Sequence, residues 1–175
     1  TSARARRRPR MYLSHIAGIY DDYLKAYAQD KQVQISDDLL WQAGLAIARK
    51  VYRLVEARGQ KVTFIGGGAR GLHHFTEMVG GDLVVTINWG GTADKLIEQD
   101  PPVVYRVYNP VPQPVIDELK AKLPDFRRGY VARGLGVDEF AEFGPVELFR
   151  SQFVKSWERV LAVAGERRRA LGLQG

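Results

Sequence analysis

The sequence predicts an α/β protein built on parallel strands, and three observations carry this prediction. Two short apolar runs rich in β-branched residues, 62–65 and 83–87, have the composition of buried strands. Each run leads into a glycine-rich stretch and a segment with helix-like character. A long amphipathic stretch, which Ser36 should cap and Gly59 should end, precedes the first run. Strands that alternate with helices in this way pair in parallel through crossover connections.

The strand–helix units are expected to fill residues 11–98. A first strand is expected at 11–16, and an amphipathic helix follows Gly18. The elements expected after it are, in order, the helix that Ser36 caps, the strand at 62–65, a helix at 72–79, the strand at 83–87 and a helix that opens at Gly90-Gly91-Thr92 with Thr92 as its N-cap.

The second half of the chain has a different character. Five prolines between 101 and 114 indicate an extended connector, within which 103–107 is expected to form a short edge strand. A helix is expected at 113–123, a basic loop at 125–136, and a last helix from Pro145 whose apolar face packs as an ordinary helix face. We expect one domain over 1–175, made of a basic lead-in (1–10), the βα units (11–98), and a connector with closing helices (99–175).

Composition narrows the classes of function. The chain has 175 residues, a net charge of +6 and no cysteine, which excludes disulfides and thiolate metal sites. Because no apolar run is long enough to cross a bilayer and no signal peptide is evident, we expect a cytoplasmic protein without a membrane partner. Five arginines between 4 and 10 leave a nucleic-acid-binding function as a remote alternative, although the cluster contains no aromatic residue and is more simply a solvated surface.

The glycine-rich turn after the strand at 62–65 is the best candidate for a binding site. Gly66, Gly68 and Gly71 spell G-x-G-x-x-G, but the next strand ends in Asn88 and supplies no carboxylate for a dinucleotide ribose. A phosphate-binding loop fits better, because Arg70 adds a bidentate donor beside the glycine amides. A plain turn with Arg70 in solvent remains the alternative.

The remaining polar residues do not assemble into a catalytic set from sequence. His73 and His74 are adjacent on an expected helix, where neighbouring side chains point in different directions, so we predict no metal site. His15 has no acidic neighbour in sequence. The acidic pair Asp21-Asp22 stands near a helix start, where the helix dipole already accounts for it.

Three segments resemble motifs of the transaldolase family. The segment Leu13-Ser-His-Ile-Ala-Gly-Ile-Tyr-Asp-Asp22 resembles the sixth-strand motif S-P-F-V-G-R-I-x-D, with Ser14 and Gly18 at its serine and glycine. Ile16 replaces the usual active-site phenylalanine, and Ile19 replaces an arginine that contributes to phosphate binding.

The other two segments follow in the family's order. Phe64-Ile-Gly-Gly-Gly-Ala-Arg70 resembles the seventh-strand motif M-G-A-S-F-R, with Arg70 at the phosphate-binding arginine and Gly68 in place of a serine. Gly81-Asp-Leu-Val-Val-Thr-Ile-Asn88 resembles the eighth-strand motif G-x-D-x-L-T-I-S, with Asn88 in place of the serine.

This resemblance implies a partial (β/α)8 TIM barrel, strands six to eight, with flanking helices and a helical C-terminal extension. It implies a transferase that moves a three-carbon ketol unit between sugar phosphates through a Schiff base. The Schiff-base lysine belongs to the fourth strand, which would precede residue 1, so no catalytic residue and no cofactor are expected in this chain. The substrate-binding residues that the resemblance implies are Ser14, Gly68, Arg70 and Asn88.

Two further expectations follow from a partial barrel. Three strands leave two open edges, so the chain is expected to associate with the missing N-terminal half of the barrel or with itself. The alternative function that shares these loops is a non-catalytic half-barrel that binds sugar phosphates.

Overall fold

The computed structural model describes residues 11–173, and the chain divides into two compact units, Thr1–Gly134 and Leu135–Gly175. The division falls inside the segment expected to hold the connector and closing helices. The arginine cluster at 4–10 lies outside the described residues. Within 11–173, no helix combines the length and the apolar character that a membrane crossing requires.

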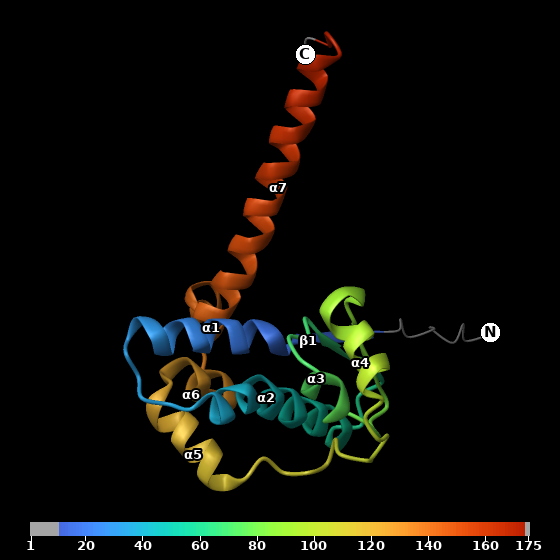
Figure 1. Ribbon diagram of the computed structural model, residues 1–175. Helices are drawn as coiled ribbons and strands as arrows, with labels where there is room; N and C mark the ends of the chain where they lie inside the picture. Colours follow the sequence, from blue (N-terminus) through green and yellow to red (C-terminus); the bar gives the residue numbers. More distant parts are fainter. Residues whose placement is uncertain (1–10, 174–175) are drawn as a thin grey trace, which may run out of the picture. The chain divides into compact units, whose positions relative to one another are not determined.

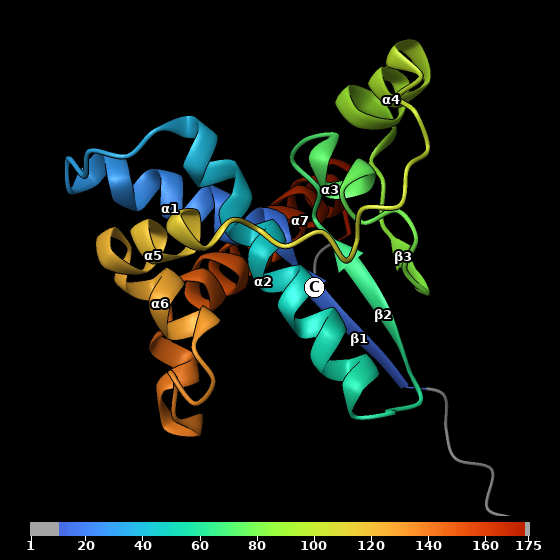
Figure 2. The ribbon, with the colours of Figure 1, turned by 90° about the horizontal axis from the view of Figure 1, so that it is seen from below.

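The first unit contains an open parallel sheet of three strands. They are β1 (Met11–Ile16), β2 (Val62–Gly67) and β3 (Leu83–Val85), in the spatial order β1-β2-β3 (Figure 2). The register pairs Met11 with Val62 and Phe64 with Leu83. The prediction of an α/β protein with parallel strands is confirmed, although β3 ends two residues earlier than expected.

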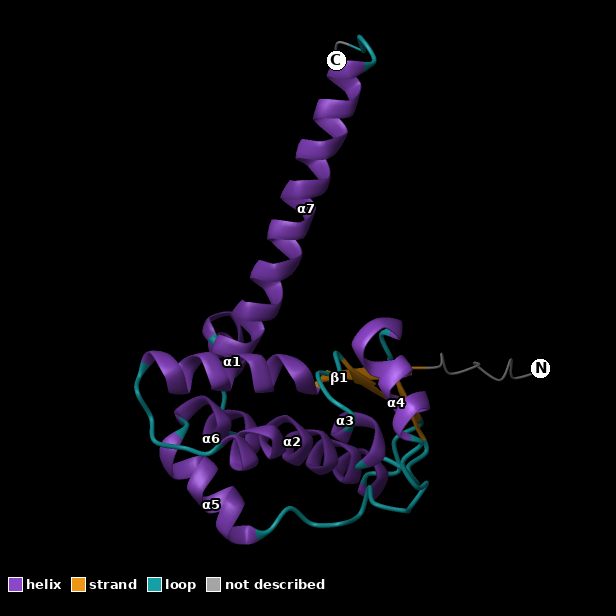
Figure 3. Ribbon diagram, in the orientation of Figure 1, coloured by secondary structure: helices purple, strands orange, loops and turns teal. Residues whose placement is uncertain are grey.

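Helices make up most of the remaining structure (Figure 3). Those of the first unit are α1 (Ala17–Asp30), α2 (Asp37–Ala57), α3 (His73–Thr76), the turn η1 (Trp89–Ala93), α4 (Asp94–Gln99), α5 (Gln113–Lys122) and α6 (Pro124–Tyr130). The second unit contains η2 (Val137–Glu142) and α7 (Gly144–Ala170).

The two faces of the sheet differ in how they are covered. Helices α2 and α3 lie on the same side of the sheet (Figure 1), where Phe64 and Tyr52 are almost fully buried. The core on this side comprises Ala17, Leu45, Ala48, Tyr52, Phe64, Met78 and Val107. On the opposite face Tyr12 is 59% exposed and Val84 53% exposed. Alternation along each strand therefore gives one packed face and one open face.

A second core lies between helices alone. It joins α1, α2, α5 and α6 and comprises Leu24, Ala28, Leu40, Ala43, Ala46, Ile47, Ile116, Leu119, Leu123 and Phe126. Helix α2 contributes to both cores, because every residue from 43 to 49 is buried. Small residues at 43, 44, 46 and 48 allow neighbouring elements to approach on several sides of this helix.

Arg49 of α2 ties the connector to the end of the α3 segment. Its side chain is buried, and Nη2 donates to Glu77 O (2.7 Å), Glu77 Oε2 (2.7 Å) and Arg106 O (2.8 Å). Arg106 also bonds to Glu77 through Nη1 and Oε1 at 3.2 Å. One guanidinium thus donates hydrogen bonds to two segments that are far apart in sequence.

The expectation of an edge strand at 103–107 is wrong. The segment is irregular, and the N–H groups of Arg106 and Val107 both donate to the carbonyl of Val79. A ladder would require alternate residues to bond along a neighbouring strand. The preceding Pro101-Pro102 pair, which cannot donate, favours this extended connector over a strand.

Three other local expectations also require correction. The segment expected as a loop at 125–136 begins with helix α6, because Pro124 occupies its first turn and Phe126 is fully buried. Helix α3 covers only part of 72–79. Thr92 does not cap α4, whose first residue is Asp94. The Thr92 hydroxyl donates instead to the Asn88 carbonyl, and the Asp94 carboxylate accepts the Gly91 N–H.

In the second unit, α7 begins at the predicted place but leaves its apolar stripe exposed. Phe153 is 63% exposed and Trp157 62% exposed, and Pro145 is the buried residue of this helix. Within the second unit, the expectation that this face packs as an ordinary helix face is therefore not met among the described residues.

Candidate functional site

The carboxyl ends of the three strands converge at one edge of the sheet. Gly68 directly follows β2 in a left-handed conformation, with φ of 64°, which glycine adopts without strain. Its N–H donates to Thr86 Oγ1 at 3.4 Å, and the Thr86 N–H donates to Gly66 O at 2.8 Å. The ends of β2 and β3 are thereby joined at the edge where parallel sheets usually bind ligands.

Arg70 lies in the loop after Gly68 and is held in place from two sides. Its Nε and Nη2 atoms lie 2.8 Å from Asp22 Oδ2, and its Nη1 donates to Gly68 O at 2.9 Å. The side chain remains 37% exposed. A guanidinium carries five N–H groups, so these contacts leave donors for an external anion. Arg70 is therefore a fixed, accessible cation, in contrast to the alternative of an unattached side chain in solvent.

Gly18, near the start of α1, permits this loop to lie directly against the helix. A Cβ atom at this position would lie 1.8 Å from Gly68 O and 2.8 Å from Arg70 Cγ. Backbone atoms cannot yield by that much, so the close approach requires glycine. Gly18 thus determines where Gly68 and Arg70 stand.

Substitution of Gly18 by alanine should push the loop away from α1 and lower the free energy of unfolding by about 3 kcal/mol, the upper part of the usual cost of overpacking. Urea unfolding measures this change. Gly90→Ala is the matched control, because Gly90 has open space around it and a negative φ. Equal stability of the two variants would contradict the assigned role.

Asp21, one residue before Asp22, faces two imidazoles. His74 Nε2 lies 3.0 Å and His73 Nε2 3.6 Å from Asp21 Oδ2, and the two rings are 4.0 Å apart. The other carboxylate oxygen accepts the Gly44 N–H at 3.0 Å. Burial raises the pKa of Asp21, but the imidazoles and the Gly44 N–H outweigh it and hold the pKa below its usual value. Asp21 is therefore a carboxylate at neutral pH.

The expectation that His73 and His74 point in different directions is wrong. They begin a helix of a single turn, and both Nε2 atoms approach the same oxygen. Asp21 and Asp22 are also not explained by the helix dipole, since α1 begins at Ala17 and places them beyond its first turn.

Among the described residues, one group has ligand atoms close enough together to hold a metal ion. It comprises Asp21, His73 and His74, whose ligand atoms lie within 4.8 Å of one another. The hydrogen bonds of His74 argue against this use. Its Nδ1 accepts the Arg70 backbone N–H at 3.0 Å and so carries no proton. A neutral imidazole then keeps its proton on Nε2, whereas a metal-bound histidine donates from its other nitrogen. The cluster is better described as two imidazoles held close to one carboxylate, with His74 also bonded to the Arg70 backbone.

His15 of β1 lies in the same region. Its ring stacks on Tyr20 at a centroid distance of 5.5 Å, and its Nε2 is buried without a hydrogen-bond partner. Burial lowers the pKa of His15 to about 4, against smaller opposing effects of the Gly44 backbone and the Asp21 charge. His15 is therefore neutral in the folded protein at neutral pH.

The other two predicted substrate residues stand at or near the same edge. Ser14 lies on the open face of β1, opposite Ile65, and is exposed. Asn88 is exposed and lies two residues after Thr86. In the described part of the chain, no hydrogen bond connects Asn88 to Arg70. Ser14, Gly68 and Arg70 are thus associated with the ends of β1 and β2, whereas Asn88 lies further along the loop after β3.

Sequence reasoning missed Asp22, Asp21 and His74 as parts of this site. A signal was present, since Asp22 lies four residues after Gly18 and so shares its helix face. A glycine there indicates that another backbone approaches that face. The identity of the approaching segment, the Arg70 loop, depends on the tertiary fold and was not evident.

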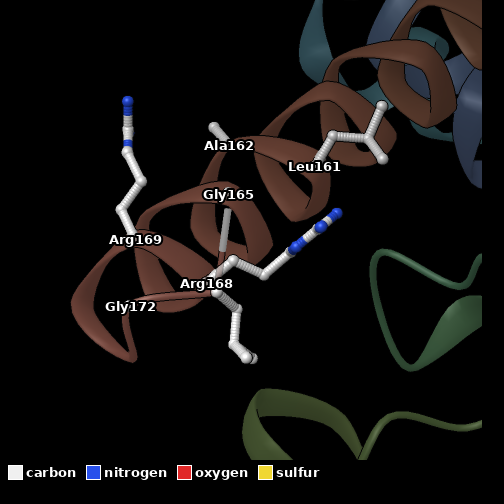
Figure 4. Close-up of a pocket in the computed structure, with 7 residues that line it drawn as sticks. Leu161, Ala162, Gly165, Arg168, Arg169 and Gly172 are labelled. Atoms are coloured by element: carbon white, nitrogen blue, oxygen red, sulfur yellow. The ribbon is translucent and has the colours of Figure 1, made fainter. Parts of the chain in front are cut away.

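A hollow of about 850 Å³ also lies at the end of α7, lined by Leu161, Ala162, Gly165, Arg168, Arg169, Gly172 and Leu173. Figure 4 shows the Arg168 and Arg169 side chains pointing in different directions. The two guanidinium groups do not converge on a common ligand, so this surface is a weaker candidate than the edge of the sheet.

Comparison with protein-family models, with curated proteins and with solved structures found no match.

Proposed function

We propose that this chain supplies the phosphate-binding part of a transaldolase-type barrel, which transfers a three-carbon ketol unit between sugar phosphates. The observation that carries the proposal is Arg70, an accessible guanidinium fixed on a glycine-rich loop at the carboxyl edge of a parallel sheet. Barrels of this architecture bind phosphate with loops at that edge. The open face of the sheet, with Tyr12 and Val84 exposed, is what the inner wall of an incomplete barrel would present.

The Arg70–Asp22 ion pair sets the expected strength of binding. Asp22 fixes the orientation of the guanidinium but also neutralises part of its charge. We therefore expect millimolar rather than micromolar affinity for inorganic phosphate. The additional contacts that a sugar phosphate makes would come from Ser14, Gly68 and Asn88.

Inorganic phosphate, followed by the shifts of backbone amide resonances, provides the test. Arg70→Ala should weaken binding about tenfold or more, the usual value of a charge-assisted hydrogen bond, while Asp22→Asn should tighten it. Arg53→Ala is the matched control, because Arg53 is an exposed arginine that bonds to the carbonyls of Tyr108 and Asn109. Equal losses in the Arg70 and Arg53 variants would refute the proposal.

A non-catalytic sugar-phosphate-binding half-barrel is the second candidate. This candidate is favoured by the position of Lys61. The residue precedes β2 and so lies at the end of that strand opposite to Arg70, too far to form a Schiff base with a substrate bound there. The Schiff-base lysine would have to come from the proposed fourth strand. Borohydride trapping on a protein that includes that strand separates the candidates, since phosphate affinity without trapping supports the non-catalytic one.

A further inference from the structure

Two adjacent acidic residues of α1 hold Arg70 by different routes. Asp22 bonds directly to the guanidinium. Asp21 acts through an intermediate, because His74 Nε2 lies 3.0 Å from Asp21 Oδ2 while His74 Nδ1 accepts the Arg70 backbone N–H at 3.0 Å. The side chain of Arg70 is thus bonded to α1, and its backbone is bonded to a ring that lies close to the same helix.

The hydrogen bond from the Arg70 backbone determines which nitrogen of His74 carries the proton. Nδ1 faces an N–H donor and must offer a lone pair, so the proton of the neutral ring is on Nε2, towards the Asp21 carboxylate. Asp21 cannot easily turn away, since its other oxygen accepts the Gly44 N–H from α2. His74 itself is only 5% exposed.

We propose that His74, with its tautomer set by the Arg70 backbone N–H, is a positioning residue that holds the β2–α3 loop in the shape that presents Arg70 to an anion. The anion in this proposal rests on the proposed phosphate-binding function, whereas the anchoring of the loop by His74 rests on the geometry described above. The other anchors of the loop act on different groups, since the Gly68 N–H bonds to Thr86 and the Arg70 side chain bonds to Asp22, whereas His74 accepts the Arg70 backbone N–H. Loss of the Nδ1 acceptor would leave the Arg70 N–H unpaired and free the loop.

His73 provides an internal control. It approaches the same Asp21 oxygen at 3.6 Å and packs edge-on against Trp41 at 5.1 Å, but it does not bond to Arg70. If the cluster contributed to stability alone, substitutions of the two histidines would have similar effects on anion binding. A role of His74 in positioning Arg70 makes them different.

The experiment compares three variants by amide NMR, with sulfate as the probe because its charge does not change near neutral pH. His74→Asn places an amide oxygen near the position of Nδ1 and can still accept the Arg70 N–H. His74→Gln reaches towards Asp21 but offers no acceptor to Arg70. His73→Gln is the control. The measurements are the sulfate dissociation constant, hydrogen exchange of the Arg70 amide, and the ¹⁵N shifts of the wild-type His74 ring.

We expect the wild-type ring to carry its proton on Nε2. His74→Gln should speed Arg70 amide exchange and weaken sulfate binding about tenfold, the value of one hydrogen bond, whereas His74→Asn and His73→Gln should stay within about threefold of wild type. A proton on Nδ1, or equal effects of the Asn and Gln variants, overturns the positioning role. The ring measurement needs no variant and so stands even if one fails to fold.

The outcomes also separate this inference from the proposed function. If the wild-type chain shows the Nε2 tautomer and a protected Arg70 amide but binds no sulfate, the anion-binding function fails while the anchoring of the loop by His74 is supported. If sulfate binds but the Arg70 amide is unprotected, the function stands and the role of His74 is refuted.

Discussion

Replacement of Arg49 by methionine should lower the free energy of unfolding by about 3 kcal/mol, the lower part of the range for breaking a buried ion pair. The methionine retains the apolar stem but leaves the carbonyls of Glu77 and Arg106 without their donor. The loss is not larger because Glu77 keeps its bond to Arg106 and is itself 21% exposed. Denaturation in urea, analysed by linear extrapolation, measures the change.

Arg53→Met is the matched control, since this arginine lies one turn further along α2 and also donates to backbone carbonyls, but from an exposed position. It should cost less than about 1 kcal/mol. If both substitutions cost the same, Arg49 is not the link between α2, the α3 segment and the connector.

Acidification should lower the free energy of unfolding by about 3 kcal/mol, because His15 is buried in its neutral form. Its pKa is lowered by burial from 6.5 to about 4, so between these values the unfolded chain binds a proton that the folded chain excludes. The contribution of His15 to the free energy of unfolding is therefore fully present above about pH 6.5 and is lost as the pH falls towards 4. Urea unfolding at several pH values across this window measures the decline.

His15→Gln should flatten the pH dependence of the free energy of unfolding in that window. Asp21 contributes separately, because its lowered pKa gives stability that is lost only as the pH falls below 3.8. Identical slopes for the wild-type chain and the variant between pH 6.5 and 4 would show that His15 is not the residue responsible.

The parallel sheet was predictable because its signals are local. Val62 to Ile65 and Leu83 to Val85 are short apolar runs bounded by turn residues, and such runs become buried strands in almost any α/β arrangement. The long helix after Ser36 was predictable for the same reason. The basic segment that became α6 was not, because its helical state depends on Phe126 being buried against a core formed mainly by other helices.

The candidate site was predictable only in part. The glycines and Arg70 identified the loop, since a run of glycines followed by a cation is evident from residue types alone. The partners of Arg70 were not. Asp22 reaches it across 48 residues, only after α1 packs beside the loop that follows β2, and the local contact with His74 depends on the shape of that loop. His73 and His74 also approach one carboxylate although they are adjacent in sequence, which only the tertiary contact with α1 reveals.

The participation of α2 in two cores has a consequence for how the first unit unfolds. A helix buried on only one side can detach from its neighbours, but α2 is enclosed from 43 to 49 by the sheet and by other helices. Opening either layer exposes the same short segment and removes support from the other. The sheet layer and the helical layer should therefore be thermodynamically coupled, and we expect them to melt as a single cooperative body despite having separate apolar interiors.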